Sequence, residues 1–328
     1  MPRIRRVPLV LIPLLLLPLT GCGSDTGGKD GAGAAPAAEG FPYTVTNCGV
    51  KTTFDAPPER VVTMNQHVTE IMLALGLRDR LVGTAYLDDS VLPEYRPAYD
   101  RTKVLAKEYP SKEVLLGANP DFVYGGYDSA FDGARGQDRA ELRKNGIDTR
   151  LNIENCTEGG VGLDQLATEI TQVARTFGVP ERGSRLIARE RRKVAAVGAD
   201  LEGSSPRSVF VYDSGDSSAF TAGGKGIGNE IVELAGGRNV FADLDATFGD
   251  VSWEEVIKRR PEVVVIYDYG GTTVAAKKKR LLNDPALADV PAIRNERFAV
   301  LPLSSAVLGV RVADAVQDLA GQLHPGTP

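Results

Sequence analysis

The sequence predicts an α/β protein of two similar lobes that are joined by a helical connector. Residues 41–328 form a body of about 288 residues, which is large for a single hydrophobic core. Strand and helix patterns alternate in both halves of this body, and such alternation indicates mainly parallel sheets covered by helices. Between the halves, residues 163–203 carry helix patterns and no strand pattern. We therefore expect an N-terminal lobe at residues 41–162 and a C-terminal lobe at residues 204–328.

Residues 1–21 have the pattern of a lipoprotein signal peptide. Three arginines precede a short apolar run over residues 7–19, which is too short to span a bilayer. Leu19 to Cys22 follows and resembles the lipobox of bacterial lipoproteins, in which the cysteine becomes residue one and carries diacylglycerol. We expect lipidation of Cys22 and an extracytoplasmic protein anchored to the cell membrane. The alternative is a plain signal peptide with a chance cysteine.

Residues 22–40 are predicted to be the lipidated cysteine and a flexible linker. This segment is mostly Gly, Ala, Ser and Asp, which offer too little apolar surface to offset the entropy of ordering. The whole chain has a formal net charge of −5, and cleavage before Cys22 would remove three arginines and bring it to −8. An acidic chain without a basic patch argues against nucleic acid as a partner. We interpret the short basic run from Lys277 to Arg280 as a solvated helix face.

Two cysteines remain besides Cys22. Cys48 and Cys156 form an even pair in a compartment that is expected to be oxidising, so we predict a disulfide between them. It would close a loop of about 108 residues and contribute roughly 4–5 kcal/mol by the chain-entropy model. The alternative is a pair of buried thiols.

In the N-terminal lobe, β-branched and apolar runs predict strands, and amphipathic segments between them predict helices. Gly146 stands just after the last predicted helix of this lobe, where a C-terminal glycine is expected. The predicted strands are residues 60–65, 81–86, 121–124 and 147–153, and the predicted helices are residues 67–77, 111–119 and 135–145.

The connector is predicted as two helices, residues 163–177 and 181–201. The second has 21 residues and would be a rod of about 30 Å, long enough to bridge two lobes and leave a cleft between them. In the C-terminal lobe we predict strands at residues 208–212, 262–267 and 298–303, and helices at residues 227–235, 251–260 and 308–323.

One motif occurs once in each predicted lobe. A serine, Ser111 or Ser252, precedes a helix, and nine residues later a proline and an acidic residue precede a buried strand. The serine would cap the helix, and a glutamate two residues further on would complement the helix dipole. Any βαβ protein contains helix-proline-strand units, but the identical spacing favours an internal duplication.

At this point the sequence resembles the periplasmic binding proteins of ABC importers for ferric siderophores, cobalamin and haem. The resemblance covers residues 41–323 and is carried by four segments: Pro57 to Val62, Glu70 to Leu77, Pro120 to Val123, and Ser252 to Val256. It implies two Rossmann-like lobes joined by a single long helix, with the ligand cleft between them, as in class III of these proteins. It also implies a monomeric, non-enzymatic protein that captures a ferric siderophore and delivers it to the permease and its ATPase.

The resemblance also implies two kinds of functional residue. A surface glutamate on each lobe meets arginines of the permease in this family, and Glu113 and Glu254 match those positions, although the helix dipole also explains them. The ligand is expected at the carboxyl ends of the strands, where open α/β sheets bind. The residues that we predict there are Asn65, Gln66, His67, Tyr86, Tyr124, Tyr127, Tyr212, Ser214, Phe220, Lys225, Trp253, Tyr267, Tyr269, Ser304 and Arg311.

The sequence leaves the identity of the ligand open. Cobalamin and haem remain alternatives, and so does a deazaflavin cofactor precursor, because a subgroup with a similar Asn47-Cys48-Gly49 start has been proposed to carry one. We expect no bound cofactor and no free-metal site, because His67 and His324 are the only histidines and such sites typically use several.

The rival classes of function are a lipid-anchored hydrolase and a ligand sensor. The chain contains no Gly-x-Ser-x-Gly motif, and a histidine-dependent triad would have to rely on His67. The loop from Gly223 to Gly226 hints at phosphate binding, but no serine or threonine follows its lysine, so the P-loop pattern is incomplete. A sensory role cannot be separated from import by sequence.

Overall fold

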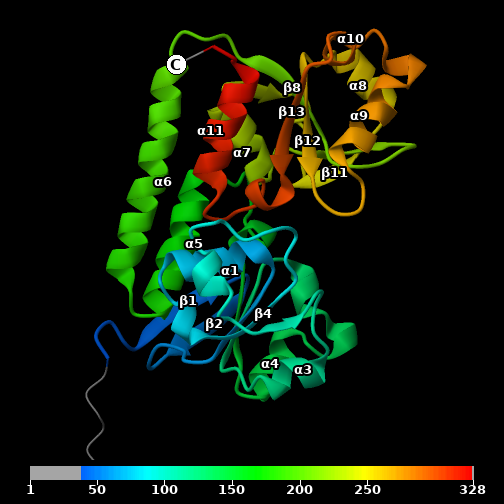
Figure 1. Ribbon diagram of the computed structural model, residues 1–328. Helices are drawn as coiled ribbons and strands as arrows, with labels where there is room; N and C mark the ends of the chain where they lie inside the picture. The colour runs from blue at the N-terminus through cyan, green and yellow to red at the C-terminus, as the bar shows by residue number, and fades with distance from the viewer. Residues whose placement is uncertain (1–37, 327–328) are drawn as a thin grey trace, which may run out of the picture. The chain divides into compact units, whose positions relative to one another are not determined.

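The computed structural model describes residues 38–326 of the chain, and these belong to one compact unit (Figure 1). The expected signal peptide, Cys22 and nearly all of the expected linker lie outside the described residues. In the described part of the chain, no helix combines the length and the apolarity that crossing a membrane would need.

The N-terminal lobe is built on a five-stranded parallel sheet. Its strand order is β5-β4-β3-β6-β7, so the first strand of the sheet along the chain, β3, lies in the middle. All residues of β3 and β6 are buried, because helices cover both faces of a parallel sheet and leave no polar side. The strands are β3 (Val61–Met64), β4 (Leu81–Ala85), β5 (Val104–Ala106), β6 (Phe122–Gly125) and β7 (Asp148–Leu151).

Four α-helices accompany this sheet. Helices α3 (Lys112–Gly117) and α4 (Arg139–Lys144) pack on one face through Leu115 and Leu142, whereas α1 (Gln66–Ala74) packs on the other face. The short helix α2 (Arg96–Tyr99) lies between β4 and β5 in the chain. The helix expected at residues 135–145 begins only at Arg139, because Asp138 caps it by accepting hydrogen bonds from two backbone amides.

A β-hairpin that the sequence analysis missed precedes this sheet. Strands β1 (Tyr43–Asn47) and β2 (Val50–Phe54) pair antiparallel around a two-residue turn in which Cys48 and Gly49 both have positive φ. The expected disulfide is present and joins Cys48 in this turn to Cys156, beyond β7. The hairpin is therefore held close to the edge strand β7 of the lobe.

The connector consists of α5 (Leu163–Thr176) and α6 (Pro180–Asp200), within a residue or two of the predicted bounds. Arg182 of α6 donates to the carbonyl oxygens of Leu75 and Gly76 in the N-terminal lobe, both at 3.1 Å. Lys193, further along α6, pairs with Asp314 in the C-terminal lobe. The long helix α6 thus contacts both lobes (Figure 1).

The C-terminal lobe contains a four-stranded parallel sheet with the order β10-β8-β12-β13. Its strands are β8 (Arg207–Tyr212), β10 (Gly237–Asn239), β12 (Val263–Asp268) and β13 (Phe298–Pro302). A second, two-stranded antiparallel sheet pairs β9 (Ala219–Ala222) with β11 (Phe248–Val251). The helices are α7 (Ile227–Leu234), α8 (Trp253–Arg259), α9 (Val274–Leu282), α10 (Pro291–Arg294) and α11 (Val312–Leu323).

The repeated motif has the same local structure in both lobes. The hydroxyl groups of Ser111 and Ser252 accept hydrogen bonds from the amides three residues on, at the starts of α3 and α8. The acidic residue after the proline, Asp121 or Glu262, accepts a hydrogen bond from a backbone amide at or just before the start of an inner strand of its sheet. The two lobes therefore share a helix-strand unit in structure as well as in spacing.

The basic run of α9 is not the solvated face that we expected. Lys277 is only 3% exposed, and its ammonium group donates to the carbonyl oxygen of Tyr267 at 2.6 Å. The guanidinium carbon of Arg280 lies 4.2 Å from the centroid of the Trp253 ring, in the geometry of a cation–π contact. The ammonium group of Lys278 lies 5.4 Å from the centroid of the Phe298 ring. The sequence interpretation was wrong here, because three of the four charges make tertiary contacts.

We predict that removal of the disulfide lowers the stability of the protein strongly. Replacing both partners, Cys48→Ser with Cys156→Ser, should lower the free energy of unfolding by about 4–5 kcal/mol, because the unfolded chain regains the entropy of a loop of 108 residues. Urea unfolding of the folded body followed by circular dichroism measures this change. As a control, a reductant should lower the stability of the wild type to that of the variant and leave the variant unchanged. Equal stability of oxidised wild type and variant would contradict the prediction.

Candidate functional site

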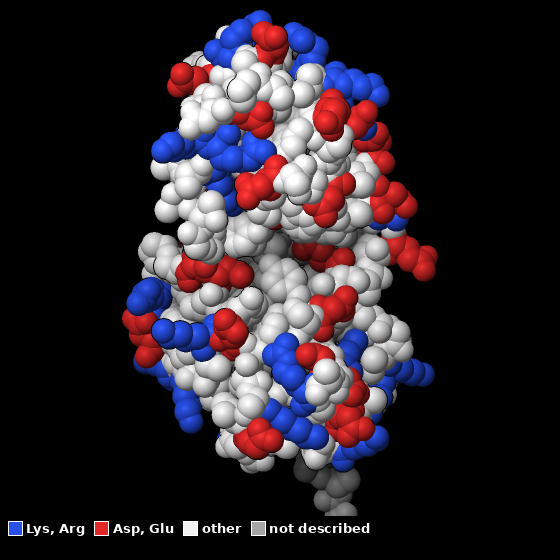
Figure 2. Space-filling model, turned by 90° about the vertical axis from the view of Figure 1, so that its right-hand side faces the viewer, with Lys and Arg blue, Asp and Glu red and all other residues white. Residues whose placement is uncertain are grey.

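The carboxyl ends of the two parallel sheets lie at the boundary between the lobes. Ser304, two residues after β13, donates to Asp89 beyond β4, and the amide of Leu308 donates to Glu154 beyond β7. Open α/β sheets bind ligands at this edge. Figure 2 shows the face on this side hollowed between the lobes, with Asp and Glu side chains on both sides of the hollow and Lys and Arg side chains mostly farther out. We call this hollow the interlobe cleft.

Aromatic side chains gather beyond the carboxyl ends of the N-terminal sheet, and we call this group the N-terminal wall. The rings of Tyr86 and Tyr109 lie 4.6 Å apart, and the ring of Tyr127 meets the His67 imidazole edge-on at 5.0 Å. The Tyr109 hydroxyl donates to Oδ1 of Asn65 at 3.1 Å. This wall offers flat apolar faces with hydroxyl groups at their rims, which suits a sizeable organic ligand.

The backbone at this wall is strained. Asn65, directly after β3, has φ 89° and ψ 153°, a conformation that side chains other than glycine rarely adopt. Hydrogen bonds fix it there, since its amide donates to Ala85 and its side chain accepts from the amide of Gly126 at 3.2 Å. A Cβ atom at Gly126 would lie 2.3 Å from the His67 ring, so only glycine allows this close approach. Such strain is concentrated at functional sites.

Three side-chain atoms near this wall are buried without a hydrogen-bond partner in the described part of the chain: Asn65 Nδ2, His67 Nδ1 and Asp88 Oδ2. Buried polar atoms almost always have a partner, so these three atoms are candidates to bind a ligand or a water. Other such atoms occur elsewhere in the described residues, but these three come from residues just beyond strand ends, beside the aromatic rings.

Burial sets the protonation of the titratable groups here. It lowers the pKa of His67 to about 4, although the Gly126 carbonyl favours the protonated ring. His67 is therefore neutral at pH 7. Burial and then the neighbouring charge of Asp89 raise the pKa of Asp88 to about 6, while Arg311 opposes both. Asp88 is thus mainly ionised at pH 7 but is easily neutralised.

A buried ion pair joins the lobes beneath the cleft. Arg311 donates two hydrogen bonds to Glu70 of α1, both at 2.7 Å, and a third to the carbonyl oxygen of Ser90. The side chains of Arg311 and Glu70 are only 8% and 1% exposed. Burial lowers the pKa of Arg311, but the hydrogen bonds and charge of Glu70 outweigh it, so the net shift is upward. We call these residues, with Ser304 and Asp89, the interlobe junction.

Three residues that were predicted to bind ligand are instead used in this junction. Arg311 donates to Glu70, to the carbonyl oxygen of Ser90 and to Ser304, and Ser304 in turn donates to Asp89. Gln66 donates to Asp89 and to the carbonyl oxygen of Ser90, and its own side-chain oxygen accepts from the Asp89 amide. They lie at strand ends, as expected, but their polar groups hold the lobes together.

Other predicted residues are placed in the packed interior. Tyr124 and Tyr267 are 0% and 1% exposed, and the Tyr124 hydroxyl donates to Glu169 in the core. The Trp253 indole donates to the carbonyl oxygen of Asp216 at 2.9 Å, and its ring belongs to an aromatic cluster with Tyr212. Neighbouring residues of a strand point to opposite faces, so a position at a strand end does not ensure that a side chain reaches the cleft.

The remaining predicted residues lie at the surface or at the C-terminal wall of the cleft. Phe220 stacks on Phe248 at 5.8 Å, and Lys225 pairs with Asp245 at 2.7 Å. Ser214 and Tyr269 line a cavity of about 250 Å³ at the carboxyl ends of β8 and β12. The cavity is also lined by Tyr212, Gly215, Asp216, Gly270, Gly271, Thr272 and Lys277.

The sequence analysis missed several residues of the site. Asp88 comes three residues after β4. The expectation that ligand contacts lie just beyond the carboxyl ends of strands could therefore have identified this residue. Asp213 follows β8 in the same way, and it accepts a hydrogen bond from the Tyr269 hydroxyl at 2.5 Å. Tyr109 lies in the loop between β5 and α3 and carried no sequence signal, because only the fold brings that loop beside Tyr86.

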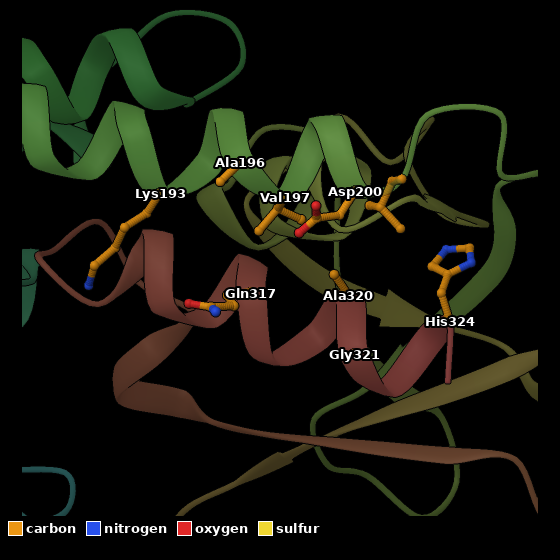
Figure 3. A pocket seen from close by; sticks show the side chains of 9 residues that line it. Lys193, Ala196, Val197, Asp200, Gln317, Ala320, Gly321 and His324 are labelled. Atoms are coloured by element: carbon orange, nitrogen blue, oxygen red, sulfur yellow. The ribbon is translucent and has the colours of Figure 1, made fainter. Parts of the chain in front are cut away.

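Another pocket lies away from the cleft, between α6 and α11 (Figure 3). It encloses about 400 Å³ and is formed by helix surfaces rather than by strand ends. Lys193 and Gln317 lie toward one end and His324 at the other. Its other lining residues are Ala196, Val197, Asp200, Leu201, Ala320 and Gly321.

The two glutamates of the repeated motif are exposed at the second positions of α3 and α8. A hydrogen bond from its own backbone amide and one from the capping serine lower the pKa of each, Glu113 and Glu254. Both are therefore ionised at neutral pH. They present one fixed negative charge at equivalent positions of the two lobes.

Comparisons with known proteins identify the class. The family model for periplasmic binding proteins matches residues 61–304, and the chain belongs to this family. Its architecture of two α/β lobes with parallel sheets is the one found in this family.

Individual relatives agree with this assignment. A solved periplasmic binding protein from Veillonella parvula is 30% identical, with a TM-score of 0.79 over 86% of this chain and 97% of that one. A structure titled as an ABC-type Fe3+-hydroxamate transport system from Saccharomonospora viridis is 28% identical, with a TM-score of 0.73 over 87% and 99%. A cobalamin-binding protein of Halobacterium salinarum is 28% identical over 270 residues, which span 80% of this chain and 66% of that protein.

The interlobe junction leads to a prediction about the free energies of unfolding of two variants. Glu70→Gln should lower the free energy of unfolding by about 3–5 kcal/mol, because it leaves the buried Arg311 without its counter-charge. The matched control is Asp314→Asn, which breaks the half-exposed pair with Lys193 and should cost less than about 1 kcal/mol. Urea unfolding measures both variants, and equal losses would show that the junction does not stabilise the lobes as described.

Proposed function

We propose that the protein is the lipid-anchored, extracytoplasmic substrate-binding component of an ABC importer, and that its cargo is a ferric siderophore. The observation that carries this proposal is the interlobe cleft itself. Facing sheet ends, an aromatic wall and three buried polar atoms without a partner among the described residues form a site for capture. Cobalamin, haem and a deazaflavin precursor are the alternative cargoes for the same site.

The proposed contact residues differ in part from those expected from sequence. We retain Asn65, His67, Tyr86, Tyr127, Ser214 and Tyr269, and add Asp88, Tyr109 and Asp213. The low pKa of His67 supports binding over hydrolysis, because a histidine with a pKa of about 4 is a weak base at neutral pH. Its neutral ring instead offers one nitrogen to a ligand.

Delivery would use a small closure of the lobes followed by docking. The junction of Arg311 and Glu70 and the single helix α6 restrain the lobes, so we expect a modest hinge motion. Glu113 and Glu254 would then meet cationic groups of the permease, one per lobe. The distance between these two glutamates would change when the lobes close, so the permease would bind the closed form differently. The ATPase of the permease would then drive import.

The remaining parts of the proposal concern the anchor and the organisation of the chain. Residues 1–21 would be removed, and Cys22 would carry the lipid that holds a monomeric protein at the membrane surface. Residues 22–40 would act as a tether for the N-terminal lobe (41–162), the connector (163–203) and the C-terminal lobe (204–328).

A ligand titration tests the proposal directly. The panel holds ferric chelates of hydroxamate, catecholate and citrate type, cobalamin, haem and a deazaflavin precursor. The signal is the fluorescence of Trp253, whose indole bonds to Asp216 at the edge of the cavity in the C-terminal wall. We expect saturable micromolar or tighter binding of one class, with calorimetry as the control for absorption by the ligand. Failure of every class to bind a folded protein would contradict the importer assignment.

Docking is tested separately from capture. The double variant Glu113→Arg with Glu254→Arg should bind cargo like the wild type but lose uptake in cells, because its charges would repel the permease. The matched control is Glu181→Arg with Glu202→Arg, which makes the same charge change at exposed positions near the ends of α6. Normal uptake with the first variant, or equal loss with the control, would argue against this docking surface.

A further inference from the structure

The charged groups at the cleft are unevenly balanced. Five carboxylates belong to the cleft and the junction beneath it, and they face two cations, Arg311 and Lys277. The carboxylates are those of Glu70, Asp88, Asp89, Glu154 and Asp213. The formal charge of this set is therefore −3. Burial strengthens the interactions of the carboxylates that are ionised, because water screens them less, and it also raises the pKa of Asp88, Glu154 and Asp213.

Both of these cations are already used inside the protein. Arg311 is held by Glu70, as described above, and the Lys277 ammonium donates to the carbonyl oxygen of Tyr267. A third cation, Arg135, lies 5.3 Å from the centroid of the Tyr109 ring at the rim and is paired with Asp132. An anionic ligand would therefore find Arg311 and Arg135 paired with carboxylates, and Lys277 as the one cation of this set without a carboxylate partner.

Asp88 is the group in this set with free binding capacity. Its Oδ2 is buried and meets no donor within residues 38–326. Asp88 directly precedes Asp89, whose carboxylate accepts a hydrogen bond from Ser304 of the C-terminal lobe. Asp88 is thus placed where the two lobes meet.

The aromatic wall, like the carboxylate of Asp88, favours ligands with a positive charge. Tyrosine faces carry a negative quadrupole that attracts cations, and Tyr86, Tyr109 and Tyr127 gather at this wall. We propose that the interlobe cleft selects neutral or cationic metal chelates over anionic chelates of similar size, and that Asp88 is the residue that determines this preference. This inference rests on the proposed function and names the class of cargo for that site.

A charge series on one chelate tests the inference with the full chain. Ferric desferrioxamine B carries a charge of about +1, its N-acetyl derivative is neutral and its N-succinyl derivative is anionic, and the three share one iron-binding core. Cyanocobalamin and its monocarboxylic acid form a second, corrinoid pair. Ferric citrate and a ferric tris-catecholate serve as anionic chelates of other types. In whichever series binds, affinity should fall by about tenfold or more from the most positive member to the anionic one.

The variant Asp88→Asn should reduce the ratio of affinities between the most positive and the anionic member by about tenfold, which corresponds to about 1.4 kcal/mol. The matched control, Asp79→Asn, removes the same charge from an exposed side chain just before the amino end of β4, whereas Asp88 follows its carboxyl end. It should leave the difference unchanged. A measurement on the wild type needs no variant: raising the salt concentration should weaken binding of the cationic member more than binding of the anionic one.

The outcomes separate this inference from the proposed function. Equal or tighter binding of anionic members, or preferred binding of the citrate or catecholate chelate, would overturn the inference and leave the importer assignment intact. An unchanged difference in a folded Asp88→Asn protein would overturn the role of Asp88. Failure of every probe to bind would overturn both.

Discussion

The arrangement of this protein depends on the buried ion pair between Arg311 and Glu70. The two groups come from different lobes and from positions 241 residues apart, yet they share two hydrogen bonds and almost no contact with solvent. Removing either partner would leave a buried charge uncompensated, so the pair strongly favours one relative position of the lobes. Ser304, Asp89 and the carbonyl oxygen of Ser90 complete its hydrogen bonding.

The junction acts together with a continuous core. The largest hydrophobic cluster includes residues of both lobes, such as Ile71 and Val211, and of the connector helices, such as Ile170 and Val194. A hinge motion must therefore bend α6 and the surrounding contacts without opening this cluster. The continuous core thus supports the modest hinge motion that is part of the proposed function.

The cleft combines groups that would be costly without a ligand. Asn65 is strained, three polar atoms lack partners among residues 38–326, and the ionised form of Asp88 is disfavoured by burial. The surrounding contacts of stable strands and helices offset these costs, as is common at binding sites. If the proposed function holds, the tyrosine wall and the carboxylate of Asp88 are preorganised for the ligand rather than formed by it.

Local patterns in the sequence determined the longer helices, the inner strands of both parallel sheets, the caps at Ser111 and Ser252 and the pairing of Cys48 with Cys156, but not the short helices α2 and α10 or the strands β1, β2, β5, β9, β10 and β11. They did so because periodicity, capping and cysteine number depend on residues close in sequence or few in kind. Only the tertiary structure decided that Tyr124 and Tyr267 face the core, that Arg311 holds Glu70, and that Tyr109 meets Tyr86. These outcomes depend on which face of a strand or loop is covered by segments far away in the chain, and no local pattern encodes that.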